Sequence, residues 1–187
     1  MSLRSDPMEP RLQPLPREEW DDETRALLGE STLNVFATFA HHPKLMKRWL
    51  VFSNHVLVKS TLPPRDRELL VLRTGWNCRA PYEWAQHVVI ARALGMSDDV
   101  IARVADGPDA DGWDEADAVL LRAADELHDD QTLSDATYAA LEARYGTQQL
   151  LDIVFTVGQY HLVSMALNAF RAERDDDVTG VPIPTRE

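Results

Sequence analysis

Hydrophobic residues recur at intervals of three and four along almost every long stretch of the chain. This spacing is typical of amphipathic α-helices, which turn once in about 3.6 residues. Prolines, glycines and short polar runs separate the predicted helices, which span residues 18–28, 44–58, 65–77, 81–94, 98–104, 115–128, 134–144 and 148–174. No stretch of useful length alternates apolar and polar residues as a strand does. The pattern therefore predicts an all-α fold, a multi-helix bundle.

The same pattern predicts a single domain at residues 17–174, because helical periodicity resumes after the turn-rich loop at 106–112. Residues 1–16 hold four prolines and predict an extended arm. Residues 175–187 contain glycine and prolines and predict a mobile tail.

One stretch, at residues 150–170, is long and apolar enough to suggest a membrane span. It includes Asp152 and His161, and a charged group at mid-bilayer costs about 2.5–3.5 kcal/mol. We therefore expect a buried central helix and no membrane partner.

The predicted helix at 81–94 is apolar on nearly all sides but contains Glu83 and His87. Their spacing of four residues places them on one face. Burying a carboxylate and an imidazole costs several kcal/mol unless they are paired or hydrogen-bonded. The pair is therefore a candidate active site.

Two further polar groups lie among apolar neighbours, Glu68 in the preceding helix and His161 in the last one. We expect the three helices to bring Glu68, Glu83, His87 and His161 to one pocket, while Arg65, Asp66 and Arg67 reach solvent. Such a cluster suits proton transfer, because desolvation raises the pKa of a carboxyl group and a carboxylate supports an imidazolium. Tyr82 and Trp84 are candidates for contacting a substrate.

Each of these residues also has a purely structural interpretation. Glu83 and His87 could form a surface ion pair, and Glu68 could pair with Arg73 or Arg92. His161 could be a hydrogen-bonded core histidine, and Tyr82 and Trp84 could serve in packing. Cys78 is interpreted as a buried inert thiol. The acidic helix end at 125–130, which contains His128, lacks converging metal-ligand spacing, so we predict neither a metal nor a cofactor.

The net charge of the chain limits which classes of partner it can bind. The 187 residues include 31 Asp and Glu and 19 Lys and Arg, which gives a net charge of −12. Nucleic acids and anionic membranes attract basic surfaces, so the balance argues against both. The single cysteine excludes an intramolecular disulfide and a Cys-x-x-Cys pair. A cytoplasmic location and a small-molecule substrate are the resulting expectations.

Three motifs together resemble the carboxymuconolactone decarboxylase family, which also contains the alkylhydroperoxidase-D-like proteins. They are Arg67-Glu68-Leu69-Leu70-Val71-Leu72-Arg73, Tyr82-Glu83-Trp84-x-x-His87-x-x-x-Ala91 and Gly95-x-Ser97-Asp98. The resemblance covers roughly residues 43–104, and the second half of the chain is similar to longer members. It implies an all-α fold that assembles into trimers or hexamers, with active sites near subunit contacts.

The hydroperoxidase branch of that family uses a thiol relay of a glutamate, a Cys-x-x-Cys pair and a histidine. By resemblance, the glutamate is Glu68 and the histidine is His87, but the two cysteine positions hold Ala80 and Glu83. A dithiol relay needs both an attacking and a resolving thiol, so we reject dithiol peroxidase chemistry. The sequence looks like the decarboxylase branch instead.

The first hypothesis is therefore a carboxymuconolactone decarboxylase-like lyase acting on a small carboxylated lactone or ring-cleavage product. His87 would donate the proton and Glu83 or Glu68 would support it, with the substrate's carboxylate held by Arg73 or Arg79. Three alternatives stay open: another proton-transfer enzyme acting on a small acid, a peroxidase-like protein using only Cys78, and a non-catalytic oligomeric binder.

Overall fold

The computed structural model describes residues 9–31 and 33–185. Within them the chain forms nine α-helices and no strand, which confirms the predicted all-α fold. The helices are α1 (Asp22–Leu28), α2 (Asn34–Phe39), α3 (Pro43–Asn54), α4 (Pro64–Asn77), α5 (Pro81–Ala93), α6 (Asp98–Asp106), α7 (Glu115–Asp129), α8 (Asp135–Glu142) and α9 (Thr147–Phe170). Short helical turns are η1 (Arg17–Glu19), the π-helical η2 (His55–Lys59) and η3 (Asp176–Val178).

The helix boundaries follow local chemistry. Proline occupies the first turn of α3, α4 and α5, where its missing N–H would have no helical partner. At the starts of α1, α6, α7 and α8, a side-chain oxygen of the capping residue accepts a hydrogen bond from a backbone N–H of the first turn. The capping residues are Asp21, Ser97, Asp114 and Ser134. The short helix α2 escaped the sequence analysis because six residues are too few for a clear period.

The last helix ends four residues earlier than predicted. Arg171 adopts a left-handed conformation with φ of 54°, and the N–H of Ala172 bonds back to the carbonyl of Leu167. This bond, together with that from the N–H of Arg171 to the carbonyl of Asn168, closes the C-terminus of α9 as a Schellman motif does.

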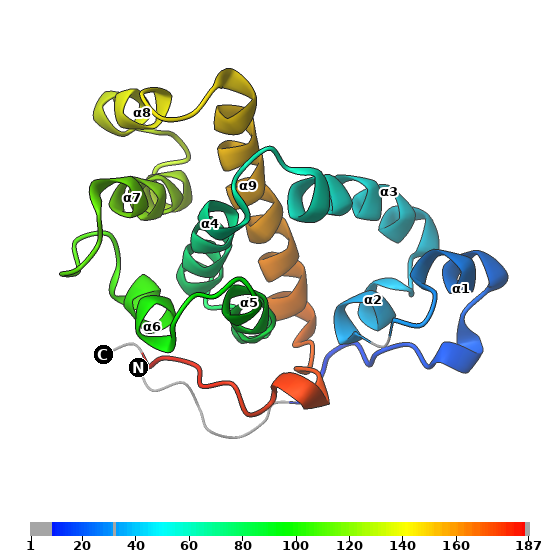
Figure 1. Cartoon of the computed structure of the whole chain (residues 1–187). Helices are drawn as coiled ribbons and strands as arrows, with labels where there is room; N and C mark the ends of the chain where they lie inside the picture. Colours follow the sequence, from blue (N-terminus) through cyan, green and yellow to red (C-terminus); the bar gives the residue numbers. More distant parts are fainter. Residues whose placement is uncertain (1–8, 32, 186–187) are drawn as a thin grey trace.

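Helix α4 forms the centre of the fold and packs against α5, α7 and α9 (Figure 1). Helices α6 to α8 lie on one side of this centre, and α1 to α3 lie on the other. The largest core cluster joins α4 to its three neighbours through fully buried side chains, among them Leu69, Leu70, Leu72, Leu120, Leu121 and Ile153.

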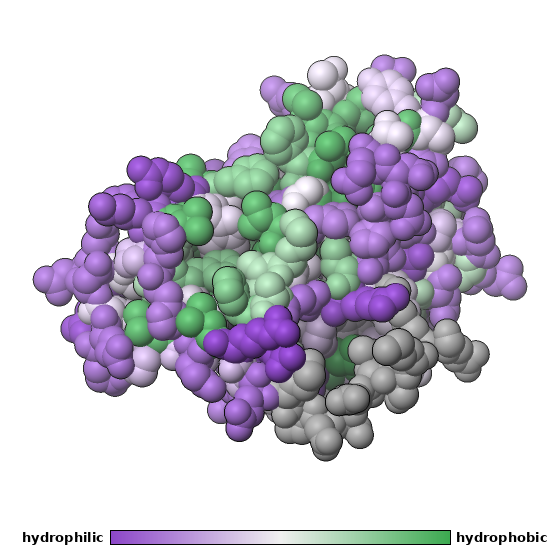
Figure 2. Space-filling model, turned by 180° about the vertical axis from the view of Figure 1, so that it is seen from behind, coloured by the Kyte–Doolittle hydropathy of each residue, from purple (hydrophilic) through white to green (hydrophobic). Residues whose placement is uncertain are grey.

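Helix α9 is only partly the buried central helix that the sequence predicts, because α4 occupies the centre and one face of α9 stays exposed. By length and composition α9 could cross a membrane, but 44% of its apolar 18-residue stretch is buried within the protein. Large apolar side chains stay exposed along it, including Leu151, Phe155 and Met165. Figure 2 shows apolar atoms gathered across the middle of the rear face of the molecule.

The structure describes the two ends of the chain more fully than the sequence suggests. The predicted mobile tail is instead packed along α5 over residues 175–185: Val178 and Val181 are buried, and Trp84 Nε1 donates to the carbonyl of Pro182 at 3.2 Å. Apolar residues in a turn-rich segment supply this contact. At the other end, Leu15 bonds through its N–H to the carbonyl of Ala37. Residues 1–8 of the predicted arm, and 186–187, lie outside the described residues.

Candidate active site

A buried ion pair links the two helices that the sequence singles out. Glu68 of α4 and His87 of α5 meet with their Oε2 and Nδ1 atoms 2.6 Å apart. Glu68 is 0% exposed and His87 is 5% exposed. Because each group satisfies the other, the cost of burying them is reduced. The structure thus brings together two of the predicted site residues.

Arg67 belongs to this site as well, which corrects the expectation that it reaches solvent. Its Nε and Nη2 atoms lie 3.2 and 3.1 Å from Glu68 Oε1, and the residue is buried. Asp66 is buried too, accepting a hydrogen bond from Tyr145 at 2.7 Å, whereas Arg65 is partly exposed. The sequence missed this because α4 is surrounded by neighbours, so even its polar side faces protein.

Glu83 completes the cluster on the other side of the imidazole. Its Oε2 lies 3.6 Å from His87 Nε2, too far for a tight hydrogen bond, and it is 6% exposed. Tyr160 of α9 meets the His87 ring edge to face, with ring centres 4.8 Å apart. Glu68, Glu83 and His87 therefore share one site, with Tyr160 beside the imidazole.

The environment moves the pKa values of all three groups. Desolvation raises the pKa of Glu83 to about 6, with Glu68 adding to the effect and His87 opposing it. Burial alone lowers the pKa of His87, but the nearby carboxylates, Glu68 first, outweigh it and raise that pKa. Burial raises the pKa of Glu68, yet His87 and Arg67 together bring it below its usual value.

These shifts define the charges that the site carries. The raised pKa of His87 favours its cationic form and the lowered pKa of Glu68 favours its anionic form, while Glu83, with a pKa of about 6, is mainly anionic at neutral pH. The imidazolium donates Nδ1–H to Glu68, which leaves Nε2–H directed toward the more distant Glu83. The N–H at Nε2 of His87 can therefore protonate a bound molecule, and the neighbouring Glu83, whose pKa is about 6, can return a proton to the imidazole.

Tyr82 and Trp84 are placed in structural contacts. The Tyr82 hydroxyl accepts from the Val35 N–H at 3.1 Å and donates to the buried carboxylate of Asp175 at 2.5 Å. Burial and then Asp175 raise the pKa of Tyr82. Trp84 packs against Trp76 while its N–H is bonded to the tail. These contacts match the packing roles that the sequence left open.

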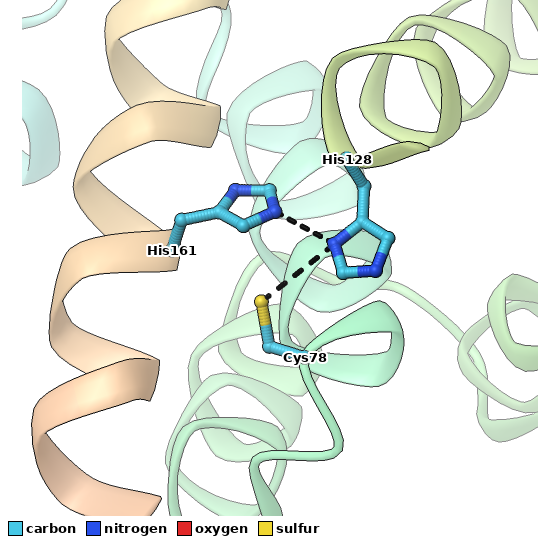
Figure 3. A group of neighbouring side chains, drawn as sticks. All are labelled: Cys78, His128 and His161. Carbon is cyan, nitrogen blue, oxygen red and sulfur yellow. Dashed lines mark hydrogen bonds between the residues drawn. The ribbon is translucent and has the colours of Figure 1, made fainter. Parts of the chain in front are cut away.

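His161 lies in a different cluster, which corrects the expectation of one common pocket. Its Nε2 is 2.7 Å from His128 Nδ1, and Cys78 Sγ is 4.0 Å from the same His128 atom (Figure 3). Tyr160 and His161 are successive residues of α9, so their side chains leave the helix in different directions. It is Tyr160, not His161, that contacts His87. Pattern analysis could not separate these two neighbours.

Two surface pockets lie elsewhere. One, of about 670 Å³, is lined by residues that include His128, Asp129 and Arg73. The other, of about 280 Å³, lies between Phe52 of α3 and Phe155 and Gln159 of α9. Neither has Glu83 or His87 in its lining. Arg73, a candidate for holding a substrate carboxylate, is engaged by Asp125 at 2.6 and 2.9 Å.

Comparison with known proteins supports the family indicated by these residues. Residues 43–126 match the model of the Carboxymuconolactone decarboxylase family. No curated protein matches the chain.

Solved structures share the whole fold. A peroxidase-related protein from Ralstonia eutropha JMP134, described as an alkylhydroperoxidase AhpD core, aligns with a TM-score of 0.80 and 20% identity over 90% of this chain and 94% of that one. A peroxidase-related protein from Silicibacter sp. TM1040 aligns with a TM-score of 0.80 and 17% identity over 94% and 97%. A cysteine-to-alanine variant of the debrominase Bmp8, in complex with 2,3,4-tribromopyrrole, aligns with a TM-score of 0.70 and 14% identity over 91% and 95%.

The fold is thus that of an AhpD-like helical bundle. The match to the carboxymuconolactone decarboxylase family over residues 43–126 confirms, for that part of the chain, the resemblance seen in the sequence. At such low identities, the solved structures establish the fold alone.

Removing Glu68 tests whether the buried pair supports the fold. We expect Glu68→Ala to lower the free energy of unfolding by about 3–5 kcal/mol, because it leaves His87 and Arg67 buried without their carboxylate. Glu142→Ala, at an exposed position of α8, is the control and is expected to change it by less than about 0.5 kcal/mol. Urea unfolding at pH 6 measures the free energy of unfolding of both variants. A change for Glu68→Ala as small as that for Glu142→Ala would contradict a role of the buried pair in stabilising the fold.

The raised pKa of Glu83 predicts a dependence of stability on pH. A carboxyl whose pKa rises from 4.5 to about 6 on folding binds its proton more tightly in the folded state. Between these values the folded protein holds more protons, so stability falls as the pH rises. Relative to Glu83→Gln, the wild type is expected to lose on the order of 2 kcal/mol from pH 4.5 to above pH 6. Denaturant unfolding at a series of pH values measures the free energy of unfolding of both proteins. The same dependence of this free energy on pH in wild type and Glu83→Gln would contradict the raised pKa of Glu83.

Proposed function

We propose that the protein is a carboxymuconolactone decarboxylase-like lyase that acts on a small carboxylated lactone or related ring-cleavage product without redox cysteines. The observation that carries the proposal is the buried Glu68–His87–Glu83 cluster, in which the carboxylates raise the pKa of His87 against the opposing effect of burial, and burial raises the pKa of Glu83 to about 6. The family match over residues 43–126 supports it.

In the proposed reaction, the bond between the substrate's carboxylate carbon and its ring breaks, and CO₂ leaves. The electron pair of that bond enters the conjugated system of the substrate. His87 then donates its Nε2 proton to the resulting carbanionic carbon, and solvent restores the proton through Glu83. Glu68 holds the Nδ1 side of the ring at 2.6 Å, which fixes the orientation of the imidazole.

The absence of a cysteine pair separates this proposal from dithiol peroxide reduction. By resemblance, Glu68 and His87 match the glutamate and the histidine of the relay in the hydroperoxidase branch. The two positions that hold cysteines in that branch hold Ala80 and Glu83 in this chain. Ala80 is buried and cannot supply a nucleophile. A carboxyl group beside the imidazole favours proton transfer at this position instead.

We further propose that the protein works in the cytoplasm as a homo-oligomer, a trimer or hexamer, and that a second copy covers the exposed face of α9. Leu151, Phe155 and Met165 are 55%, 52% and 63% exposed on this helix, and Val51 of α3 is 73% exposed. Apolar side chains gathered at this density favour association over solvation. A subunit contact here would lie on α9, which also carries Tyr160 of the active site.

His87→Ala tests the lyase proposal directly. With 4-carboxymuconolactone as substrate, we expect CO₂ release to fall by about 10²–10⁴-fold, the usual contribution of a positioned acid. The exposed His41→Gln is the matched control and is expected to keep wild-type activity. Equal turnover by wild type and His87→Ala would remove His87 from the mechanism, and turnover by none of the three would remove this substrate.

Light scattering after size-exclusion chromatography tests the assembly. We expect the wild type to elute as a trimer or hexamer and Phe155→Asp to shift toward the 21.1 kDa monomer, because a carboxylate is costly to bury in an apolar contact. Tyr138→Asp places the same charge on α8, where the tyrosine is 46% exposed, and is expected to leave the assembly intact. A monomeric wild type would end the proposal.

A further inference from the structure

Three metal-binding side chains converge where the end of α4 meets α7 and α9. They are Cys78, His128 and His161, and one ligand atom of each lies within 4.8 Å of the others. Figure 3 shows the three side chains directed toward one another from separate parts of the fold. All three are half-buried. Residues 50 and 33 positions apart in the sequence thus meet at a single point.

We propose that Cys78, His128 and His161 bind a divalent transition-metal ion, Zn²⁺ foremost, at a site separate from the Glu68–His87–Glu83 cluster. A thiolate and two imidazoles form a donor set that suits Zn²⁺ and excludes Mg²⁺ and Ca²⁺, which prefer oxygen. The proposal does not rest on the proposed lyase function.

The spacing of the ligand atoms is close to what the ion requires. With Zn–N distances of about 2.0–2.1 Å and Zn–S of about 2.3 Å, tetrahedral geometry puts two nitrogens about 3.3 Å apart and nitrogen and sulfur about 3.5 Å apart. The observed separations are 2.7 Å between the imidazole nitrogens and 4.0 Å between Cys78 Sγ and His128 Nδ1. Both values change to the required ones through side-chain shifts of less than about 1 Å.

The tautomer of His161 is already the one that a metal ligand needs. Its Nδ1 lies 2.9 Å from the carbonyl oxygen of Val157, which can only accept, so Nδ1 carries the proton. The lone pair is then on Nε2, the atom that faces His128 and the cysteine. Histidine ligands of metals usually donate their second N–H to a carbonyl or carboxylate in this way.

His128 has a carboxylate near its other nitrogen. Its Nε2 lies 3.9 Å from Asp129 Oδ1, while its Nδ1 faces the centre of the cluster. When a metal takes Nδ1, the imidazole proton moves to Nε2, on the side of Asp129. The neighbouring carboxylate favours that tautomer.

The site also has room for a fourth ligand. His128 and Asp129 line the surface pocket of about 670 Å³, together with Arg73, Trp76 and Asn77. Three protein ligands beside an open pocket are the arrangement in which Zn²⁺ retains a water molecule or takes a small anion, whereas structural zinc sites have four protein ligands. The proposed ion would thus be accessible from solvent.

Metal titration of the full chain tests the site. After chelation and dialysis, we expect the wild type to bind one equivalent of Co²⁺ with a thiolate-to-metal charge-transfer band, and Zn²⁺ to displace it. Cys78→Ser is expected to lose the band, and His161→Gln to weaken Zn²⁺ binding by at least about 100-fold. His41→Gln, which removes an exposed imidazole elsewhere, is the matched control and is expected to bind as the wild type does.

A measurement on the unaltered protein covers the case in which a variant fails to fold. Bound Zn²⁺ is expected to slow the alkylation of Cys78 at least tenfold, and X-ray absorption at the zinc edge is expected to show one sulfur and two imidazole nitrogens. Absence of stoichiometric binding, or undiminished binding by both Cys78→Ser and His161→Gln, overturns the proposal. Metal-independent oxidation of Cys78 to a sulfenic acid by peroxide, without metal binding, would replace it with the single-cysteine peroxidase alternative.

Discussion

The ion pair between Glu68 and His87 is the interaction on which the arrangement of the central helices depends. It joins α4 to α5 at a point where neither side chain meets solvent, and Arg67 adds a second cation to the same carboxylate. A buried carboxylate without these partners would cost several kcal/mol. The helices must therefore pack in the one register that brings the three groups together. The same register holds Nε2 of the imidazole toward Glu83.

Helix α9 connects this site to the rest of the molecule. Its buried face contributes Tyr160 to the His87 site, and the next residue, His161, joins the cluster with His128 and Cys78. Two adjacent residues of one helix thus contact two different polar clusters, one around His87 and one around His128. Its remaining face is apolar and exposed. A long helix that serves a core, two polar clusters and an open surface cannot show a single amphipathic period, and its hydrophobic pattern is correspondingly diffuse.

Much of the fold could be predicted from local chemistry. Prolines in the first turns of α3, α4 and α5 and caps at Asp21, Ser97, Asp114 and Ser134 mark the helix starts, and these act within a few residues. The pairing of Glu83 with His87 was equally predictable, since four residues bring side chains to one face of a helix. The packed tail was not, because its burial depends on the surface of α5, far away in the sequence.

The sequence by itself determined the helical class, the approximate positions of eight of the nine described α-helices, the family resemblance and the presence of an acid and an imidazole among apolar residues. All of these follow from spacing within one helix or from short motifs. Only the tertiary structure decided that Arg67 is buried, that Tyr160 rather than His161 contacts His87, and that Cys78 lies beside two histidines. The physical reason is that these contacts join residues on different helices, and their geometry is set by how the helices pack, which local periodicity does not encode.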